Sequence, residues 1–168
     1  MASKSKAKGS GFEREVCKFL TEHYGETFTR VPNSGAFIGG KNAHRKDTLH
    51  EAQIRGFKGD IIPGESFPKL NVECKNYADF SFHLLLTENA QLEGWLEQLM
   101  DVADVGDLNV LFMKFNRIGK YVVVQANQPW VNTCSYTLYR SPKFGDWMVY
   151  SFEKYFELNS ELFKQLSK

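Results

Sequence analysis

Long apolar segments are missing from this sequence, and their absence excludes one class of protein. Apolar runs such as those at 84–86 and 122–124 are far too short to cross a bilayer. The N-terminal segment MASKSKAKGS is basic and polar, and no apolar stretch follows it, so we expect no secretory signal. We therefore expect a cytoplasmic or nucleoid-associated protein that is not secreted and binds no membrane.

Cysteine is also scarce: the chain of 168 residues contains three, at Cys17, Cys74 and Cys134. An odd number at wide spacing does not form a disulfide framework, and no pair has the short spacing of a zinc site. We interpret the three residues as reduced thiols of a cytosolic protein.

Charge is nearly balanced overall, with a net charge of +1, but it is unevenly distributed along the chain. Residues 1–58 carry eleven Lys or Arg against six Asp or Glu, whereas residues 59–168 carry ten against fourteen. A local positive surface suits a polyanionic partner. A solvated tail followed by a solvated loop explains the same excess, so charge alone leaves both interpretations open.

The first half of the chain predicts one helix and three strands. Residues 10–24 have the apolar spacing of an amphipathic helix, with Ser10 and Glu13 as a capping box and Gly25 as its end. Strands are expected at about 26–31, from Asp60 to 62, and at about 70–77. We expect the Gly-rich residues 35–58 to form a long, mobile, basic loop, and residues 1–9 to form a basic flexible tail.

The second half predicts two further helices and more strands. Helical spacing runs from about 87 to 105, strands follow at 108–115 and 120–126, and a hairpin is expected from 135–140 and 146–152. A helix at about 153–166 closes the chain. We predict a single α/β domain over 1–168, in which residues 127–168 are a C-terminal extension packed on the core.

The strand KLNVECKNY raises a chemical question, because Leu70, Val72 and Cys74 alternate with polar residues. Glu73 and Lys75 therefore point the same way from the sheet. Twelve residues separate Asp60 from Glu73, and if their strands are neighbours the two carboxylates converge. Hard oxygen ligands suit Mg²⁺ or Mn²⁺, with the Cys74 carbonyl as a further ligand. An ordinary surface ion pair between Glu73 and Lys75 is the competing interpretation.

Two other segments add to this pattern. Glu13 falls beside Leu20 on the apolar face of the first predicted helix, where a carboxylate is costly unless it is paired or bound. The capping box also explains Glu13. In RVPNSGA, small residues let a phosphate approach the backbone, and Asn33 and Ser34 can bind its oxygens, although an ordinary turn has the same composition.

Taken together, these segments resemble the PD-(D/E)XK nuclease superfamily, and within it the archaeal-type Holliday junction resolvases. The resemblance is carried by KGSGFEREV, RVPNSGA, KGD and VECK, in that order along the chain. It implies a restriction-endonuclease-like core, with a mixed central β-sheet flanked by α-helices. It also implies a metal-dependent endodeoxyribonuclease of DNA recombination and repair that uses Mg²⁺, or Mn²⁺ as a substitute, and no small-molecule cofactor.

The resemblance also assigns roles to residues of this sequence. Glu13, Asp60, Glu73 and Lys75 become the catalytic set, with Ser34 as a catalytic-loop residue. The expected metal ligands are Asp60, Glu73, the Cys74 carbonyl and Glu13. The expected partners are DNA, four-way or otherwise branched, and a second copy of the chain. The expected DNA-binding residues are Arg30, Asn33, Ser34, Lys41, Arg45, Lys46, Arg55 and Lys58.

Two features depart from the family pattern. Gly59 stands where the superfamily has its proline, and twenty-five residues lie between Ser34 and Asp60, more than a compact resolvase needs. That insertion fits either a DNA-gripping arm or the specificity loop of another nuclease. A restriction- or repair-type endonuclease acting on linear duplex, and a non-catalytic nucleic-acid-binding protein with a nuclease fold, therefore remain alternatives.

Overall fold

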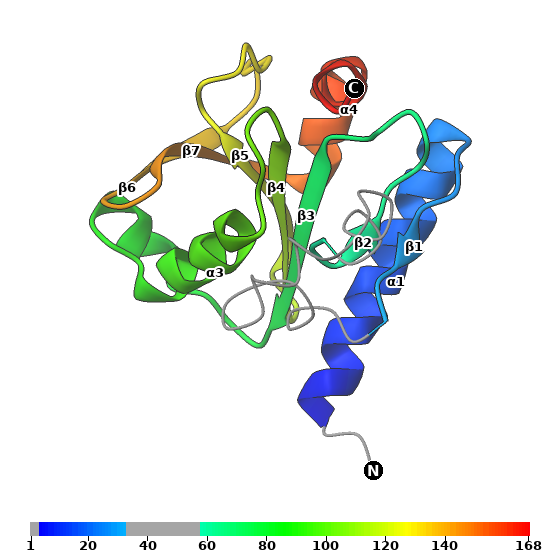
Figure 1. Cartoon of the computed structure of the whole chain (residues 1–168). Helices are drawn as coiled ribbons and strands as arrows, with labels where there is room; N and C mark the ends of the chain where they lie inside the picture. The colour runs from blue at the N-terminus through cyan, green and yellow to red at the C-terminus, as the bar shows by residue number, and fades with distance from the viewer. Residues whose placement is uncertain (1–3, 33–57) are drawn as a thin grey trace.

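The computed structural model describes residues 4–32 and 58–168 of the chain (Figure 1). Three α-helices and one short 3-10 helix lie in this part: α1 (Lys4–Tyr24), η2 (Phe82–Leu86), α3 (Ala90–Asp101) and α4 (Phe152–Leu166). The strands are β1 (Thr29–Arg30), β2 (Ile61–Ile62), β3 (Leu70–Tyr77), β4 (Leu108–Phe115), β5 (Gly119–Gln125), β6 (Tyr136–Ser141) and β7 (Gly145–Ser151).

The described strands form one large and one small sheet. The large sheet has the order β3-β4-β5-β7-β6, and β3 lies at its edge. Strands β3 and β4 are parallel, with Glu73 opposite Leu111, and the other pairs are antiparallel. In the small sheet, Arg30 of β1 lies opposite Ile61 of β2. A mixed sheet flanked by helices confirms the predicted α/β class and is consistent with a restriction-endonuclease-like fold.

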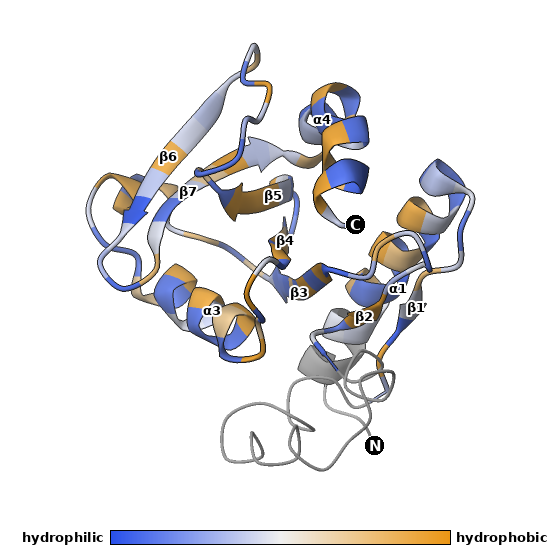
Figure 2. Ribbon diagram, turned by 45° about the horizontal axis from the view of Figure 1, so that its top comes forward, coloured by the Kyte–Doolittle hydropathy of each residue, from blue (hydrophilic) through white to orange (hydrophobic). Residues whose placement is uncertain are grey.

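Helices cover both faces of the large sheet, which explains why its central strands β4 and β5 are mostly apolar. In Figure 1, α3 lies on one side of the sheet, and α1 and α4 lie on the other. The core on the α1 and α4 side includes Leu20, Val72 and Phe112. The core on the α3 side includes Trp95 and Leu111. Figure 2 accordingly shows β4 and β5 as mostly hydrophobic.

Two helix predictions differ from the structure. The first helix already begins at Lys4, so Ser10 lies inside α1 and the predicted capping box is wrong. The helix expected from 87 to 105 is shorter in the structure, where α3 spans Ala90–Asp101 and η2 precedes it as a separate 3-10 helix. Asn89 sets the start of α3, because its side-chain oxygen accepts a hydrogen bond of 2.9 Å from the Leu92 amide and caps the helix.

The C-terminal part of the chain contributes directly to the sheet. β7 pairs with β5, β6 pairs with β7, and α4 packs on the same sheet. The segment between β5 and β6 is held by the buried Asn159 of α4. Its side-chain oxygen accepts a hydrogen bond from the Val131 amide at 2.7 Å, and its side-chain nitrogen donates to the Val131 carbonyl at 3.1 Å. Within 4–32 and 58–168, no helix combines the length and apolarity that crossing a membrane requires.

A tight turn at Gly59 joins the small sheet to the edge of the large one. The Asp60 amide donates to the Val72 carbonyl at 2.8 Å, and the Asp60 carbonyl accepts from the Val31 amide at 2.9 Å. Gly59 has φ +64°, and a Cβ atom there would lie 2.3 Å from the Val72 carbonyl oxygen. Proline, whose ring fixes φ near −65°, cannot adopt this turn. The glycine at this position is therefore required by the local backbone.

We expect Gly59→Ala to lower the free energy of unfolding by about 2 kcal/mol or more, because it adds a backbone clash to the unfavourable φ. Urea denaturation measures this loss. Gly25→Ala is the matched control, since Gly25 has φ +68° and nothing within 4 Å of the added Cβ. Equal losses in the two variants would contradict the importance of the close approach to Val72.

Candidate active site

Glu73 and Lys75 lie on the edge strand β3 and face α3. Alternation along the strand places Asn71, Glu73 and Lys75 on one side, and Val72 and Cys74 in the core on the other. The Lys75 ammonium lies 2.6 Å from a Glu73 carboxylate oxygen. It also donates a hydrogen bond to the side-chain oxygen of Gln98 on α3. Both members of the Glu73–Lys75 pair are largely buried, unlike an ordinary surface ion pair.

Asp60 is bound to the outer side of the same strand. One of its carboxylate oxygens accepts a hydrogen bond of 2.7 Å from the Cys74 amide, and its side chain is buried. In an extended strand the amide and the carbonyl of one residue point to the same side. The Cys74 carbonyl is therefore directed to the side of β3 where Asp60 lies, between the two residues of the Glu73–Lys75 pair.

Glu13 reaches this region from α1. It lies on the buried face of the helix with 8% of its surface exposed, as its helical position predicts. Its carboxylate accepts from the guanidinium of Arg30, and Arg30 lies on β1 opposite Ile61, the residue after Asp60. The small β1–β2 sheet thus links Glu13 to the Asp60 turn through Arg30.

The carboxylates share one electrostatic environment. The pKa of Glu73 is raised to about 7, mainly by burial and also by the negative charges of Asp60 and Glu13, while Lys75 opposes the rise. Burial, together with Asp60, raises the pKa of Glu13, although Arg30 lowers it. The two basic side chains therefore do not fully offset the cost of gathering buried negative charge, and a cation at this edge would relieve that cost.

The chemistry of the donors fits a hard divalent cation. Asp60, Glu73 and the Cys74 carbonyl offer oxygen atoms, the ligands that Mg²⁺ and Mn²⁺ prefer. In the described part of the chain, no three His, Cys, Asp or Glu side chains are arranged to hold a metal ion together. The side chains that could contribute are thus two carboxylates, with the backbone and water supplying the remaining ligands.

Two cysteine thiols lie close to the carboxylates but do not suit nucleophilic chemistry. Burial raises the pKa of the Cys17 thiol to about 11, and burial beside the carboxylates raises the pKa of the Cys74 thiol as well. All three cysteines of the chain are free of disulfide bonds. Both buried thiols stay protonated at neutral pH, so they do not provide the thiolate that a cysteine nucleophile needs.

The predicted DNA-binding residues divide into three groups. Six of them lie outside the described residues: Asn33, Ser34, Lys41, Arg45, Lys46 and Arg55. Arg30 is described, and its guanidinium pairs with Glu13. Lys58, expected to bind DNA, is buried in the structure, and its ammonium is bound to Asp104 and Asp107. The physical reason is a tertiary one, since the turn between α3 and β4 folds over Lys58.

Sequence reasoning missed Gln98. Its side chain contacts the Lys75 ammonium, yet no spacing rule relates a residue in the middle of an acidic helix to one on a preceding strand. Only the packing of α3 against β3 reveals the contact. Asp107 was missed for the same reason, because a lone aspartate before a strand reads as an ordinary turn residue.

Comparison with known proteins identified a protein family. A family model described as phage putative PDDEXK endonuclease matches residues 4–167, nearly the whole chain. No curated protein and no solved structure matches the sequence. The match supports the PD-(D/E)XK superfamily predicted from the motifs, and it includes the C-terminal residues that the motif resemblance did not explain. It does not extend to the Holliday junction resolvase branch.

The raised pKa of Glu73 predicts a pH-dependent stability in the absence of metal. The native residue keeps its proton until about pH 7, whereas the unfolded residue releases it near its ordinary value of 4.5. The contribution of Glu73 to the free energy of unfolding is therefore fully present below about pH 4.5, and it is lost as the pH rises through 7. Glu73→Gln should remove that loss and should be more stable than the wild type at pH 8, by up to about 3 kcal/mol.

Urea denaturation in EDTA between pH 5 and pH 8 measures the effect. Glu97→Gln is the control, because Glu97 lies on α3 in an exposed ion pair with Lys143. If the wild type and Glu73→Gln show parallel pH dependence, Glu73 is not the group responsible.

Proposed function

The chain belongs to the phage putative PDDEXK endonuclease family, and we propose that it is a Mg²⁺-dependent endonuclease that hydrolyses phosphodiester bonds in branched DNA. Family membership makes it a nuclease with DNA as its substrate. The observation that carries the proposal is the juxtaposition of Asp60 with the buried Glu73–Lys75 pair at the edge of β3. A non-catalytic binding protein would have no need to maintain this costly cluster.

In this proposal, Asp60, Glu73 and the Cys74 carbonyl hold the cation. When bound, the cation neutralises charge that develops on the phosphate and lowers the pKa of a coordinated water. Two observations support this assignment: these residues offer oxygen ligands at one edge of β3, and the pKa of Glu73 is raised. Glu13, which Arg30 holds beside the same edge, supports these ligands or contributes to a second ion position.

Lys75 is proposed to position the attacking water. Its ammonium is oriented by Glu73 on its own strand and by Gln98 on α3, so few rotamers remain open to it. The water gives up a proton as its oxygen forms a bond to phosphorus, and the P–O3′ bond breaks. The leaving oxygen takes up a proton as a 3′-hydroxyl, and a 5′-phosphate remains. Lys75 also stabilises negative charge in the transition state.

The choice of branched DNA rests on the order of motifs in the sequence, which resembles that of junction resolvases.

The chain leaves the described part at Pro32 and re-enters it at Lys58. The Val31 amide donates a hydrogen bond to the Asp60 carbonyl, and Lys58 lies two positions before Asp60. Both ends of the basic segment between Pro32 and Lys58 therefore lie at the candidate site. We propose that this segment, with Asn33, Ser34 and Arg30, contacts the DNA backbone, and that two copies of the chain act on one junction.

We expect Lys75→Ala to reduce the single-turnover cleavage rate by about 100-fold or more, because it removes a preorganised charge at the reacting phosphate. Affinity for DNA, measured in Ca²⁺ by fluorescence anisotropy, should change little. Lys154→Met is the matched control, since Lys154 is exposed on α4. An unchanged cleavage rate in Lys75→Ala would overturn the role assigned to this lysine.

Substrate class is tested with a labelled four-way junction and a linear duplex of the same sequence. In Mg²⁺ at moderate salt, we expect paired nicks near the branch point, and none in EDTA or with Glu73→Gln. Equal cleavage of the duplex would keep the metal chemistry and replace branched DNA by linear DNA. Binding of both DNAs without cleavage would contradict the enzymatic proposal.

A further inference from the structure

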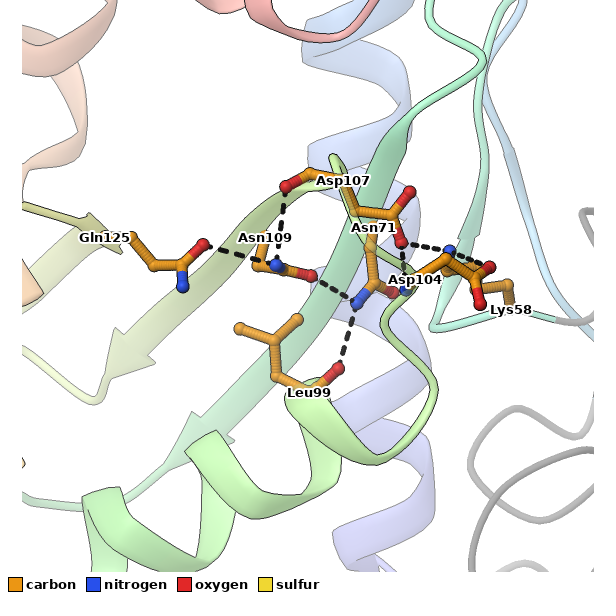
Figure 3. Close-up of polar contacts among 7 residues, drawn as sticks. All are labelled: Lys58, Asn71, Leu99, Asp104, Asp107, Asn109 and Gln125. Atoms are coloured by element: carbon orange, nitrogen blue, oxygen red, sulfur yellow. Dashed lines mark hydrogen bonds and ion pairs between the residues drawn. The ribbon is translucent and has the colours of Figure 1, made fainter. Parts of the chain in front are cut away.

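A buried lysine lies immediately before the Asp60 turn. The Lys58 side chain is 9% exposed, and its ammonium lies 2.9 Å from a carboxylate oxygen of Asp104. It also donates to Asp107, whose side chain is 7% exposed. The same Asp107 oxygen accepts from the Asp104 amide at 2.6 Å. We refer to Lys58, Asp104 and Asp107 as the lysine clamp (Figure 3).

The clamp joins the Asp60 turn to the far end of α3. Asp104 and Asp107 belong to the segment between α3 and β4, and Lys58 is two residues before Asp60. The two ion pairs of the clamp therefore join Lys58 to aspartates that lie 46 and 49 positions later in the sequence. Helix α3 also carries Gln98, which contacts Lys75. Helix α3 and the segment after it thus contact both the Asp60 turn, through Lys58, and the Glu73–Lys75 pair, through Gln98.

A row of amide side chains continues from the clamp across the sheet (Figure 3). Asn71 on β3 donates to the Leu99 carbonyl at 2.9 Å and to the Asn109 side chain at 2.8 Å. Asn109 on β4 in turn donates to Gln125 on β5 at 3.2 Å and makes a longer contact, 3.4 Å, with the Asp107 carbonyl. The segment that holds Lys58 is therefore linked to β4 by Asn109, and through Asn109 to β3 and β5.

The turn between the clamp and Asp60 has little room to adjust. Gly59 packs so closely that a Cβ atom would meet the Val72 carbonyl at 2.3 Å and the Asn71 side-chain oxygen at 3.1 Å. Displacement of Lys58 would therefore be transmitted directly to Asp60. A buried ion pair adds little net stability compared with apolar residues, because removing its charges from water is expensive. The buried ion pair of Lys58 is therefore better explained by its position next to the Asp60 turn than by a contribution to stability.

We propose that Lys58 is a positioning residue, which fixes the Asp60 carboxylate beside Glu73 and thereby sets the affinity of the site for a divalent cation. The inference rests on the proposed function and extends it. It also gives Lys58 a role other than the DNA contact expected from the sequence. Neither Lys58 nor Asp107 needs to touch the metal or the DNA for this role.

The test compares Lys58→Met, the charge-neutral double variant Lys58→Met/Asp107→Asn, and the exposed control Lys154→Met. Calorimetric titration with Mn²⁺, at a temperature where each protein is folded, measures metal affinity without DNA. Loss of the clamp should weaken Mn²⁺ binding by about 10-fold or more, as expected for a group that orients a ligand. The Mn²⁺ concentration for half-maximal cleavage should rise by a similar factor, while the rate at saturating Mn²⁺ recovers.

The double variant keeps the test decisive if Lys58→Met alone does not fold, because it leaves no unpaired Asp107 charge. A lower melting temperature with unchanged Mn²⁺ affinity would overturn the inference and assign the clamp to stability alone. Unchanged Mn²⁺ affinity but weaker DNA binding would restore Lys58 as a DNA contact. If the wild type itself binds no Mn²⁺, the proposed function fails, and that result is distinct from a failure of the clamp.

Discussion

Attachment of Asp60 to the edge of β3 is the constraint on which the rest of the site depends. Its amide bonds to Val72, and its carboxylate accepts from Cys74, so the backbone of β3 holds both ends of the residue. These contacts bring Asp60 to the strand that carries Glu73 and Lys75. They also require a left-handed turn at Gly59, which explains why the proline that names the superfamily is absent here.

This arrangement gathers carboxylates in a place where burial makes their charge expensive. The protein offsets the charge with separate cations, since Arg30 pairs with Glu13 and Lys75 pairs with Glu73. The offset is incomplete, as the raised pKa values of Glu73 and Glu13 indicate. In the proposed function, a bound cation would offset the remaining cost, which is the expected compromise between stability and catalysis.

Local patterns predicted much of the fold and the site. Alternation in KLNVECKNY predicted β3 and placed Glu73 and Lys75 on one face, and helical periodicity placed Glu13 toward the core. Local patterns failed at two helix starts and at one residue that another element encloses. Helix α1 extends past the predicted capping box, Asn89 begins a new helix after η2, and Lys58 is enclosed by the segment after α3.

The sequence by itself determined the α/β class, the nuclease superfamily and the residues able to supply acid, base and oxygen ligands. These properties depend on residue type and on short spacings, which folding does not alter. Only the tertiary structure decided which of those residues meet. The contacts of Asp60 with β3, of Gln98 with Lys75 and of Lys58 with Asp107 join segments 14, 23 and 49 residues apart. Such contacts depend on how helices and strands pack, and no local pattern encodes them.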